Sequence, residues 1–229
     1  MFIVLEGLDG AGKSTQIRYL LDFYVRHGLI FRFIHFPRFD APVYGPLVAM
    51  FLRGELGAID QVSPQLVALL FAGDRHQAAP QIRDWLSQGY VVIADRFVYS
   101  NIAYQCAKVE DLVQRERLRK WILHTEYIDF NLPKPDLNLF LDVPLSFVAE
   151  KLNTLRNGEE RDYLMGKPDI HEKNLAFQER VRKVYLEQCE IDRGFIMIPC
   201  GDSKGAMLPE MDIFSLIQKA VETKKRLIK

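Results

Sequence analysis

A nine-residue stretch near the start of the chain constrains the fold more than any other feature. It follows the apolar run Phe2–Leu5 and consists of Gly7, Leu8, Asp9, Gly10, Ala11, Gly12, Lys13, Ser14 and Thr15. This is a complete G-x-x-x-x-G-K-[ST] pattern, which is typical of a loop that joins a strand to a helix. The glycines let consecutive backbone N–H groups converge on a phosphate, and the helix that begins near Lys13 adds its dipole. We therefore expect this loop to bind the phosphates of a nucleoside triphosphate.

Two side chains of the loop have expected roles of their own. Lys13 is placed to bridge the β- and γ-phosphates, and the hydroxyl of Ser14 is placed to coordinate Mg²⁺. A glycine-rich turn without a ligand is the alternative. The Lys-Ser pair and the flanking strand and helix favour phosphate binding, with ATP and Mg²⁺ as the expected cofactors.

The rest of the chain predicts a doubly wound α/β fold of the P-loop type. Five apolar runs are expected to form a parallel sheet, at Phe2–Leu5, Ile30–Phe36, Tyr90–Ala94, Leu137–Leu141 and Gly194–Ile198. They do not alternate in polarity, as is typical of strands that are covered on both faces. Helical periodicity occurs at Lys13–His27, Pro64–Gln88, Asp111–His124, Leu145–Leu155, Ile170–Cys189 and Met211–Arg226. We expect one domain over residues 1–229, with helices on both faces and a short exposed lid at about 155–169.

Composition excludes several classes of function. Thirty Lys and Arg balance thirty Asp and Glu, so no nucleic-acid or membrane partner is indicated. The three cysteines and five histidines lack the spacing of a disulfide framework or of a transition-metal site. No run approaches the roughly 20 apolar residues of a membrane span, so we expect a protein of the reducing cytoplasm.

The phosphate loop alone leaves the phosphate acceptor open. The absence of an N-K-x-D motif after the loop argues against a GTPase and favours a small metabolic kinase. Three further blocks, Phe36–Arg38, Leu70–Arg75 and Asp95–Gln105, occur in the order and spacing of thymidylate kinases. The chain resembles that family over nearly its whole length. The resemblance implies transfer of the γ-phosphoryl group of ATP to thymidylate.

Asp95 and Arg96 follow the third predicted strand, at the sheet edge where doubly wound folds bind ligands. The guanidinium of Arg96 can bind the phosphate of an acceptor nucleotide and reduce the repulsion between two phosphorylated substrates. The family uses its matching arginine in this way. Asp95 can hold Mg²⁺ through water or hold Arg96 in place, and the sequence does not choose between the two.

The acceptor's base and sugar are expected at residues on the following helices. Phe71 and Arg75 are four residues apart on a predicted helix, so a ring and a guanidinium can together bind a pyrimidine. A core phenylalanine beside a surface arginine is the alternative without the resemblance. The resemblance assigns acceptor contacts also to Asp9, Phe36, Pro37, Arg38, Ser100, Asn101, Tyr104 and Gln105. In it Asp9 accepts a hydrogen bond from the sugar 3′-hydroxyl, and Tyr104 excludes a ribose by crowding.

The resemblance also implies that one catalytic arginine comes from the lid. Some family members carry this arginine in the phosphate loop, where this chain has Gly10. The candidates are Arg156 and Arg161, and Arg161 is preferred because it lies deeper in the loop. The catalytic set expected is therefore Lys13, Asp9, Arg96, Arg161 and Arg156.

The resemblance implies a homodimer and nucleotides as the only other partners. Two alternatives stay open at this point. The chain could be another (deoxy)nucleoside monophosphate kinase on the same scaffold, or a nucleotide-dependent switch or adaptor that binds a protein partner.

Overall fold

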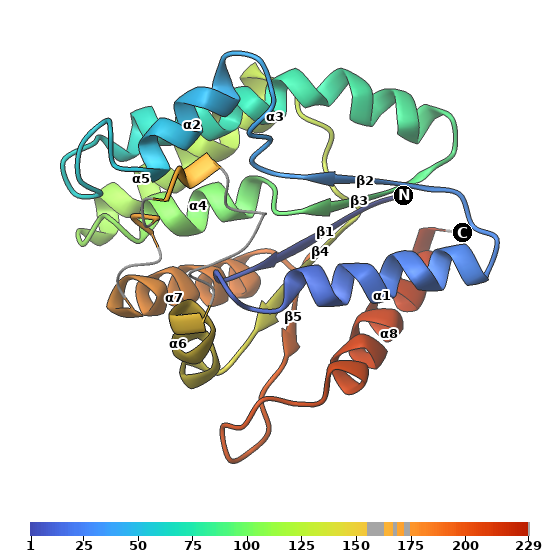
Figure 1. The fold of residues 1–229 in the computed structure, drawn as a ribbon. Coiled ribbons are helices and arrows are strands. Elements are labelled where there is room, and N and C mark those ends of the chain that lie inside the picture. Colours follow the sequence, from blue (N-terminus) through green and yellow to red (C-terminus); the bar gives the residue numbers. More distant parts are fainter. Residues whose placement is uncertain (155–162, 167–168, 172–174, 229) are drawn as a thin grey trace.

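The computed structural model describes all residues except 155–162, 167–168, 172–174 and 229. Its centre is a sheet of five parallel strands in the order β2-β3-β1-β4-β5 (Figure 1). The strands are β1 (Phe2–Gly7), β2 (Phe31–His35), β3 (Val91–Asp95), β4 (Leu137–Asp142) and β5 (Phe195–Pro199). All five predicted strands are confirmed, with ends that differ by one or two residues.

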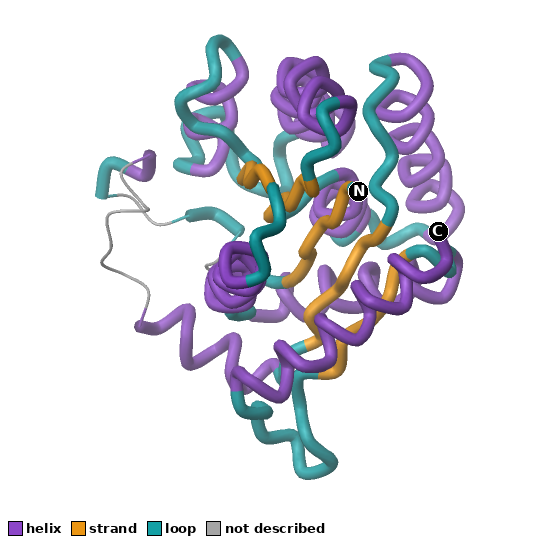
Figure 2. The backbone as a smooth tube through the Cα atoms, turned by 90° about the vertical axis from the view of Figure 1, so that its right-hand side faces the viewer, coloured by secondary structure: helices purple, strands orange, loops and turns teal. Residues whose placement is uncertain are grey.

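Helices cover both faces of this sheet, and the strands lie between them when the molecule is turned (Figure 2). The helices are α1 (Lys13–Arg26), α2 (Tyr44–Leu52), α3 (Pro64–Ser87), α4 (Val98–Cys106), α5 (Leu112–His124), α6 (Leu145–Thr154), α7 (Leu175–Ile191) and α8 (Glu210–Ile228). On one face α1 packs against α8, and on the other α4 packs between α3 and α7. The predicted doubly wound fold is thus confirmed.

The predicted burial of the sheet is correct only for its centre. Every side chain of β1 is buried, and β3 and β4 are nearly as well covered. In β2, however, Arg32, Phe33 and His35 are exposed. The cause is position, because β2 is an edge strand that pairs only with β3.

Two helices escaped the sequence analysis for a physical reason. All nine residues of α4 are buried, so its sequence has no polar face and no helical period. In α2 the apolar run Leu47–Leu52 is equally uniform, and it follows a glycine and a proline. A third element, the π-helix at Thr125–Asp129, continues α5 and has no sequence signature.

The helix predicted at Ile170–Cys189 begins later than expected. Residues 169–171 are not helical, and α7 starts at Leu175. Asp169 and His171 are buried, with their side chains 6% and 5% exposed. The backbone N–H of Ile170 donates to the carbonyl of Leu52 at the end of α2. This short segment is therefore part of the packed body of the protein.

The strand order places the chemically important loops side by side. β1 pairs with β3 and with β4, so the chain switches direction across the sheet at β1. Leu5 is opposite Asp95 in this register, and the backbone N–H of Arg96 donates to the carbonyl of Leu5. The phosphate loop after β1 and the Asp95-Arg96 pair after β3 therefore meet at one edge, where doubly wound sheets bind ligands.

Candidate active site

The phosphate loop connects β1 to α1 and leaves the start of that helix open. Gly12 occupies the N-cap of α1 with φ of 76°, a left-handed conformation that glycine adopts without strain. No side chain caps the helix. The N–H groups of its first turn are therefore available to an anion.

Lys13 lies folded back over this loop. Its Nζ donates to the carbonyls of Leu8, at 3.0 Å, and of Gly7, at 3.4 Å, and the residue is 7% exposed. Burial, together with the positive charge of Arg96, lowers the pKa of the Lys13 ammonium to about 8. Its two acceptors are neutral carbonyl oxygens. A negatively charged phosphate would bind this ammonium more strongly.

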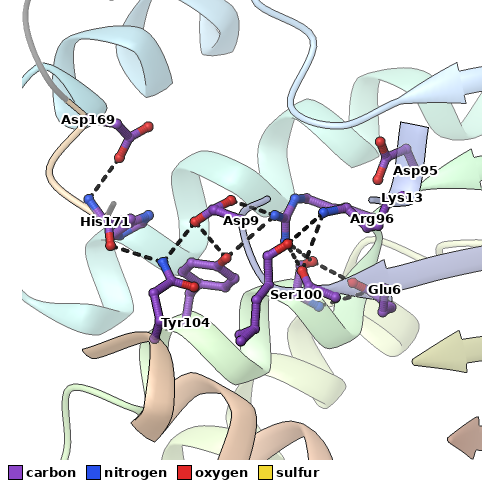
Figure 3. A network of polar contacts seen from close by, with 12 residues as sticks. Glu6, Asp9, Lys13, Asp95, Arg96, Ser100, Tyr104, Asp169 and His171 are labelled. Carbon is purple, nitrogen blue, oxygen red and sulfur yellow. Dashed lines mark hydrogen bonds and ion pairs between the residues drawn. The ribbon is translucent and has the colours of Figure 1, made fainter. Parts of the chain in front are cut away.

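Asp9 of the loop and Arg96 after β3 form the centre of the site (Figure 3). An Oδ1 to Nη2 distance of 2.6 Å joins them, and both side chains are mostly buried. The other carboxylate oxygen of Asp9 accepts from the hydroxyl of Tyr104 at 2.8 Å and from the amide of Gln178 at 3.0 Å. The Asp9 carboxyl has a lowered pKa because the charges of Arg96 and Lys13 and the Tyr104 hydrogen bond outweigh its burial. Asp9 is thus an anion fixed by three donors.

Arg96 is fixed through its backbone as well as its side chain. Its φ of 64° lies in the left-handed region, which is uncommon for a residue with a Cβ. Nη1 donates to the carbonyl of Gly7 at 2.9 Å and to the hydroxyl of Ser100 at 3.2 Å. The guanidinium therefore bridges the phosphate loop and α4.

Asp95 has the free oxygen that a metal site requires. Its Oδ2 lies 3.3 Å from Nδ1 of His35, while Oδ1 is buried and has no hydrogen-bond partner among the residues that the structure describes. Lys13 and His35 lower the pKa of this carboxyl despite its burial, so it is ionised. An unpaired, charged carboxylate oxygen beside the phosphate loop is the donor type that Mg²⁺ prefers. The residues present therefore fit a nucleotide-bound Mg²⁺, held by Asp95 and by the exposed Ser14 on the loop.

Two of the residues predicted to bind the base, Arg75 and Asn101, meet at the buried carboxylate of Glu126. Arg75 is 2% exposed, and its Nε and Nη2 donate to Glu126 at 2.5 and 2.8 Å. Asn101 donates to the same carboxylate at 2.8 Å, and its Oδ1 has no hydrogen-bond partner in the described part of the chain. Phe71 packs with Phe51 at a ring distance of 6.4 Å. Arg75 is therefore a buried partner of Glu126, and the alternative of a surface arginine is wrong.

Arg38 is likewise engaged within the protein. It follows the cis Phe36–Pro37 peptide and donates to Asp74 through its backbone N–H and its Nε, both at 2.8 Å. Phe36 is 1% exposed and belongs to the main core. Gln105 is 1% exposed, and its amide oxygen accepts from Lys108 at 2.8 Å.

Several residues of the site were missed by the sequence analysis. Glu126, in the π-helix, and Gln178, on α7, carry no local signal because their roles arise from contacts distant in sequence. His171 lies 5.0 Å from the ring of Tyr104, and burial lowers the pKa of its imidazole to about 3. Glu6 is a charged residue in an otherwise apolar strand, a signal that was visible in the sequence. Arg156 and Arg161 lie outside the described residues.

Fold and site together define a class of protein. A phosphate loop on a parallel sheet, with an arginine from the neighbouring strand at its open side, is typical of P-loop nucleotide kinases. The profile of the thymidylate kinase family matches residues 5–210, and the chain belongs to this family.

Individual relatives agree with this assignment. A probable thymidylate kinase of Thermococcus kodakarensis is 34% identical, over 97% of this chain and 92% of its own. A thymidylate kinase of Mycobacterium tuberculosis is 34% identical, over 82% and 85% of the two chains. The structure of thymidylate kinase from Candida albicans superposes with a TM-score of 0.70 at 29% identity, covering 98% of this chain and 92% of that one.

The lowered pKa of Lys13 predicts a pH-dependent affinity for ATP. ATP binds the charged ammonium of Lys13. Above about pH 8 this group is mostly neutral in the free protein, so it must take up a proton when ATP binds. The dissociation constant should then rise by up to about tenfold per pH unit. Calorimetry from pH 7 to 9.5 in buffers of different ionisation enthalpy measures both effects. Lys13→Arg, which stays charged, should give a flat profile, and a flat profile for both proteins would contradict the prediction.

The Arg75–Glu126 pair predicts a large loss of stability on removing one partner. Arg75→Leu leaves the Glu126 carboxylate buried and uncompensated, which should cost about 3–5 kcal/mol in urea unfolding. Replacing both residues by Leu should restore at least half of this loss. Arg83→Leu, on the exposed side of the same helix, is the control and should cost no more than about 0.5 kcal/mol. A single Arg75 variant as stable as that control would refute the prediction.

Proposed function

We propose that the protein transfers the γ-phosphoryl group of ATP to dTMP and releases dTDP and ADP. Membership of the thymidylate kinase family supports this reaction. The observation that carries it is the contact between Arg96 and Asp9, because it places a phosphate-binding guanidinium at the open side of the phosphate loop. The phosphates of ATP on the loop and the phosphate of dTMP at Arg96 would therefore lie close enough for transfer.

The donor nucleotide binds at residues 7–15. Their N–H groups surround its phosphates, and Lys13 leaves the carbonyls of Gly7 and Leu8 for the β- and γ-phosphates. Ser14 and Asp95 hold the Mg²⁺ of the nucleotide, which supplies charge neutralisation when bound. Because Asp95 already has an ionised, unpaired oxygen, its carboxylate needs no rearrangement to serve in this role.

The acceptor binds between Arg96 and the residues around α3 and α4. Its phosphate takes hydrogen bonds from Arg96, with Arg38 nearby, and its sugar 3′-hydroxyl donates to Asp9. Tyr104 packs against the sugar, while Phe71, Arg75, Ser100 and Asn101 surround the base and Phe36, Pro37 and Gln105 support them. The buried, unpaired Oδ1 of Asn101 supports an acceptor contact at that position, because such an oxygen is costly unless a ligand pairs it.

Catalysis by this site is chiefly alignment and charge stabilisation. Arg96 and Lys13 approach the transferred phosphoryl group from two sides, and their positive charges offset the negative charge on its oxygens. Gly10 supplies no charge in the phosphate loop, so an arginine of residues 155–162 completes the set. Arg161 is the first candidate and Arg156 the second.

The setting of the reaction is also proposed. No helix among the described residues is long and apolar enough to cross a membrane. We place the enzyme in the cytoplasm as a homodimer, following the family resemblance.

An acceptor panel tests the proposed reaction. ADP release should be measured with dTMP, dUMP, UMP, CMP and dGMP at fixed ATP and Mg²⁺, and dTMP should give the highest kcat/KM. The Candida albicans enzyme is described as having broad substrate specificity, so secondary activity on other monophosphates is compatible with the proposal. A low rank for dTMP would indicate another monophosphate kinase. Hydrolysis of ATP that no monophosphate stimulates would indicate a nucleotide switch.

The lid assignment makes a separate kinetic prediction. Arg161→Ala should lower kcat by about 10²-fold or more while the KM for dTMP changes little, since its charge is required in the transition state. Arg156→Ala is the matched control and should have a much smaller effect on kcat. Equal losses of kcat in both variants, or a loss confined to Arg156→Ala, would show that Arg161 is not the lid arginine that acts.

A further inference from the structure

Glu6 is a buried carboxylate directly beneath the phosphate loop. It is the only charged residue of β1, whose sequence is FIVLEG, and it is 0% exposed. Burial raises the pKa of this carboxyl, and its hydrogen bonds and the charge of Arg96 oppose that shift. A leucine here would avoid the desolvation penalty. The retention of a buried acid therefore requires an explanation.

Both oxygens of the Glu6 carboxylate accept hydrogen bonds from donors at the start of α4 and on α7. Oε1 accepts from the backbone N–H of Phe97, at 2.9 Å, and of Ser100, at 3.2 Å. Oε2 accepts from the hydroxyls of Ser100 and Tyr185, the latter at 3.1 Å. α4 has no side-chain cap of its own at Phe97. Glu6, on β1, therefore caps the N-terminus of α4, although it lies 91 residues before Phe97 in the chain.

This cap fixes the residue that comes directly before it. Arg96 has a left-handed backbone conformation, which is strained for a residue with a Cβ. Its N–H is tied to Leu5, and the next N–H along, that of Phe97, is tied to Glu6. Its Nη1 donates to the Ser100 hydroxyl that itself contacts Glu6. The carboxylate thus restrains Arg96 through the backbone, by way of Phe97, and through the side chain of Ser100. Figure 3 shows the contacts that Ser100 makes with Arg96 and Glu6.

The cap also limits where an acceptor phosphate can bind. A helix N-terminus at the edge of a parallel sheet is an anion site in its own right. In α4 the N–H groups of Phe97 and Ser100 are directed to Glu6 inside the protein. These two N–H groups are therefore not available to a phosphate at this edge of the sheet.

We propose that Glu6 is a positioning residue for Arg96, and that it determines how well the enzyme recognises the phosphate of its acceptor nucleotide. The inference rests on the proposed role of Arg96 as the ligand of that phosphate. Glu6 itself touches no substrate. Substitution of Glu6 should therefore weaken the binding of the acceptor's phosphate and leave the binding of its nucleoside unchanged.

Two substitutions separate the geometry of Glu6 from its charge. Glu6→Asp keeps the charge but withdraws both oxygens by one carbon–carbon bond, about 1.5 Å, from α4. Glu6→Gln removes the charge but keeps an Oε1 for both N–H groups, and the two hydroxyls can turn to accept from its amide. Val4→Ala is the matched control, because Val4 is buried two residues earlier on the same face of β1.

Calorimetric dissociation constants for dTMP and for thymidine, which has no phosphate, provide the readout. In Glu6→Asp the constant for dTMP should rise about tenfold while that for thymidine stays within about twofold. Glu6→Gln should stay within about threefold of the unchanged protein for both ligands, and Val4→Ala should not alter the ratio of the two. Equal weakening of both ligands in Glu6→Asp, or selective loss of dTMP in Glu6→Gln, would overturn the proposal. If Glu6→Asp does not fold, Glu6→Leu takes its place, because leucine offers no acceptor to the N–H groups of Phe97 and Ser100, and the same selective rise for dTMP is expected.

Arg96→Ala distinguishes this inference from the function on which it rests. If that variant loses dTMP selectively while Glu6→Asp loses both ligands equally, Arg96 binds the phosphate and Glu6 does not position it. If Arg96→Ala binds dTMP as well as the unchanged protein does, the proposed phosphate site itself fails, and the inference fails with it.

Discussion

The guanidinium of Arg96 is the interaction on which the rest of the site depends. It connects two elements that are far apart in the chain, since it contacts Asp9 and Gly7 in the phosphate loop and Ser100 and Tyr104 on α4. Its position follows from the parallel pairing of β1 with β3, which brings residue 96 level with the end of β1. A change of register by one residue would turn the side chains of β3 to the opposite face and separate these groups.

Charge complementarity explains how so many ionised groups share a small buried volume. For Asp9, Asp95 and Arg96 the attraction between opposite charges outweighs the loss of water, so the charged form of each is favoured. For Lys13 and Glu6 burial has the larger effect, and the pKa of each moves toward its neutral form. The individual contacts are exchangeable, because a nucleotide phosphate can replace a carbonyl at Lys13. In the free protein the positively charged side chains therefore make internal hydrogen bonds. Substrate phosphates, which carry more negative charge, can replace these partners.

The parts of the structure that depend on local sequence were predicted, and those that depend on contacts between distant residues were not. The phosphate loop and the five strands were predicted correctly because Gly12, Lys13 and the apolar runs act locally. The helix α4 was missed because burial on all sides removes the polar face that sequence periodicity requires. Glu126 and Gln178 could not be found, since their partners lie 51 and 169 residues away. For Arg75 the sequence predicted a ligand contact on a helix face but not the internal carboxylate that holds it.

Four of the seven buried side-chain polar atoms that lack a partner among the described residues belong to residues at or next to the site. Oδ1 of Asp95, Oδ1 of Asn101, Nε2 of His171 and Oε1 of Gln178 have no hydrogen-bond partner among the described residues. The amide of Gln178 cannot be turned to relieve this, because its Nε2 already donates to two acceptors, the Asp9 carboxylate and the carbonyl of His171. Each such atom lowers stability, and a fold selected for stability alone would replace it. Their concentration around Asp9 and Arg96 indicates that the fold gives up stability here to keep hydrogen-bonding groups ready for a ligand.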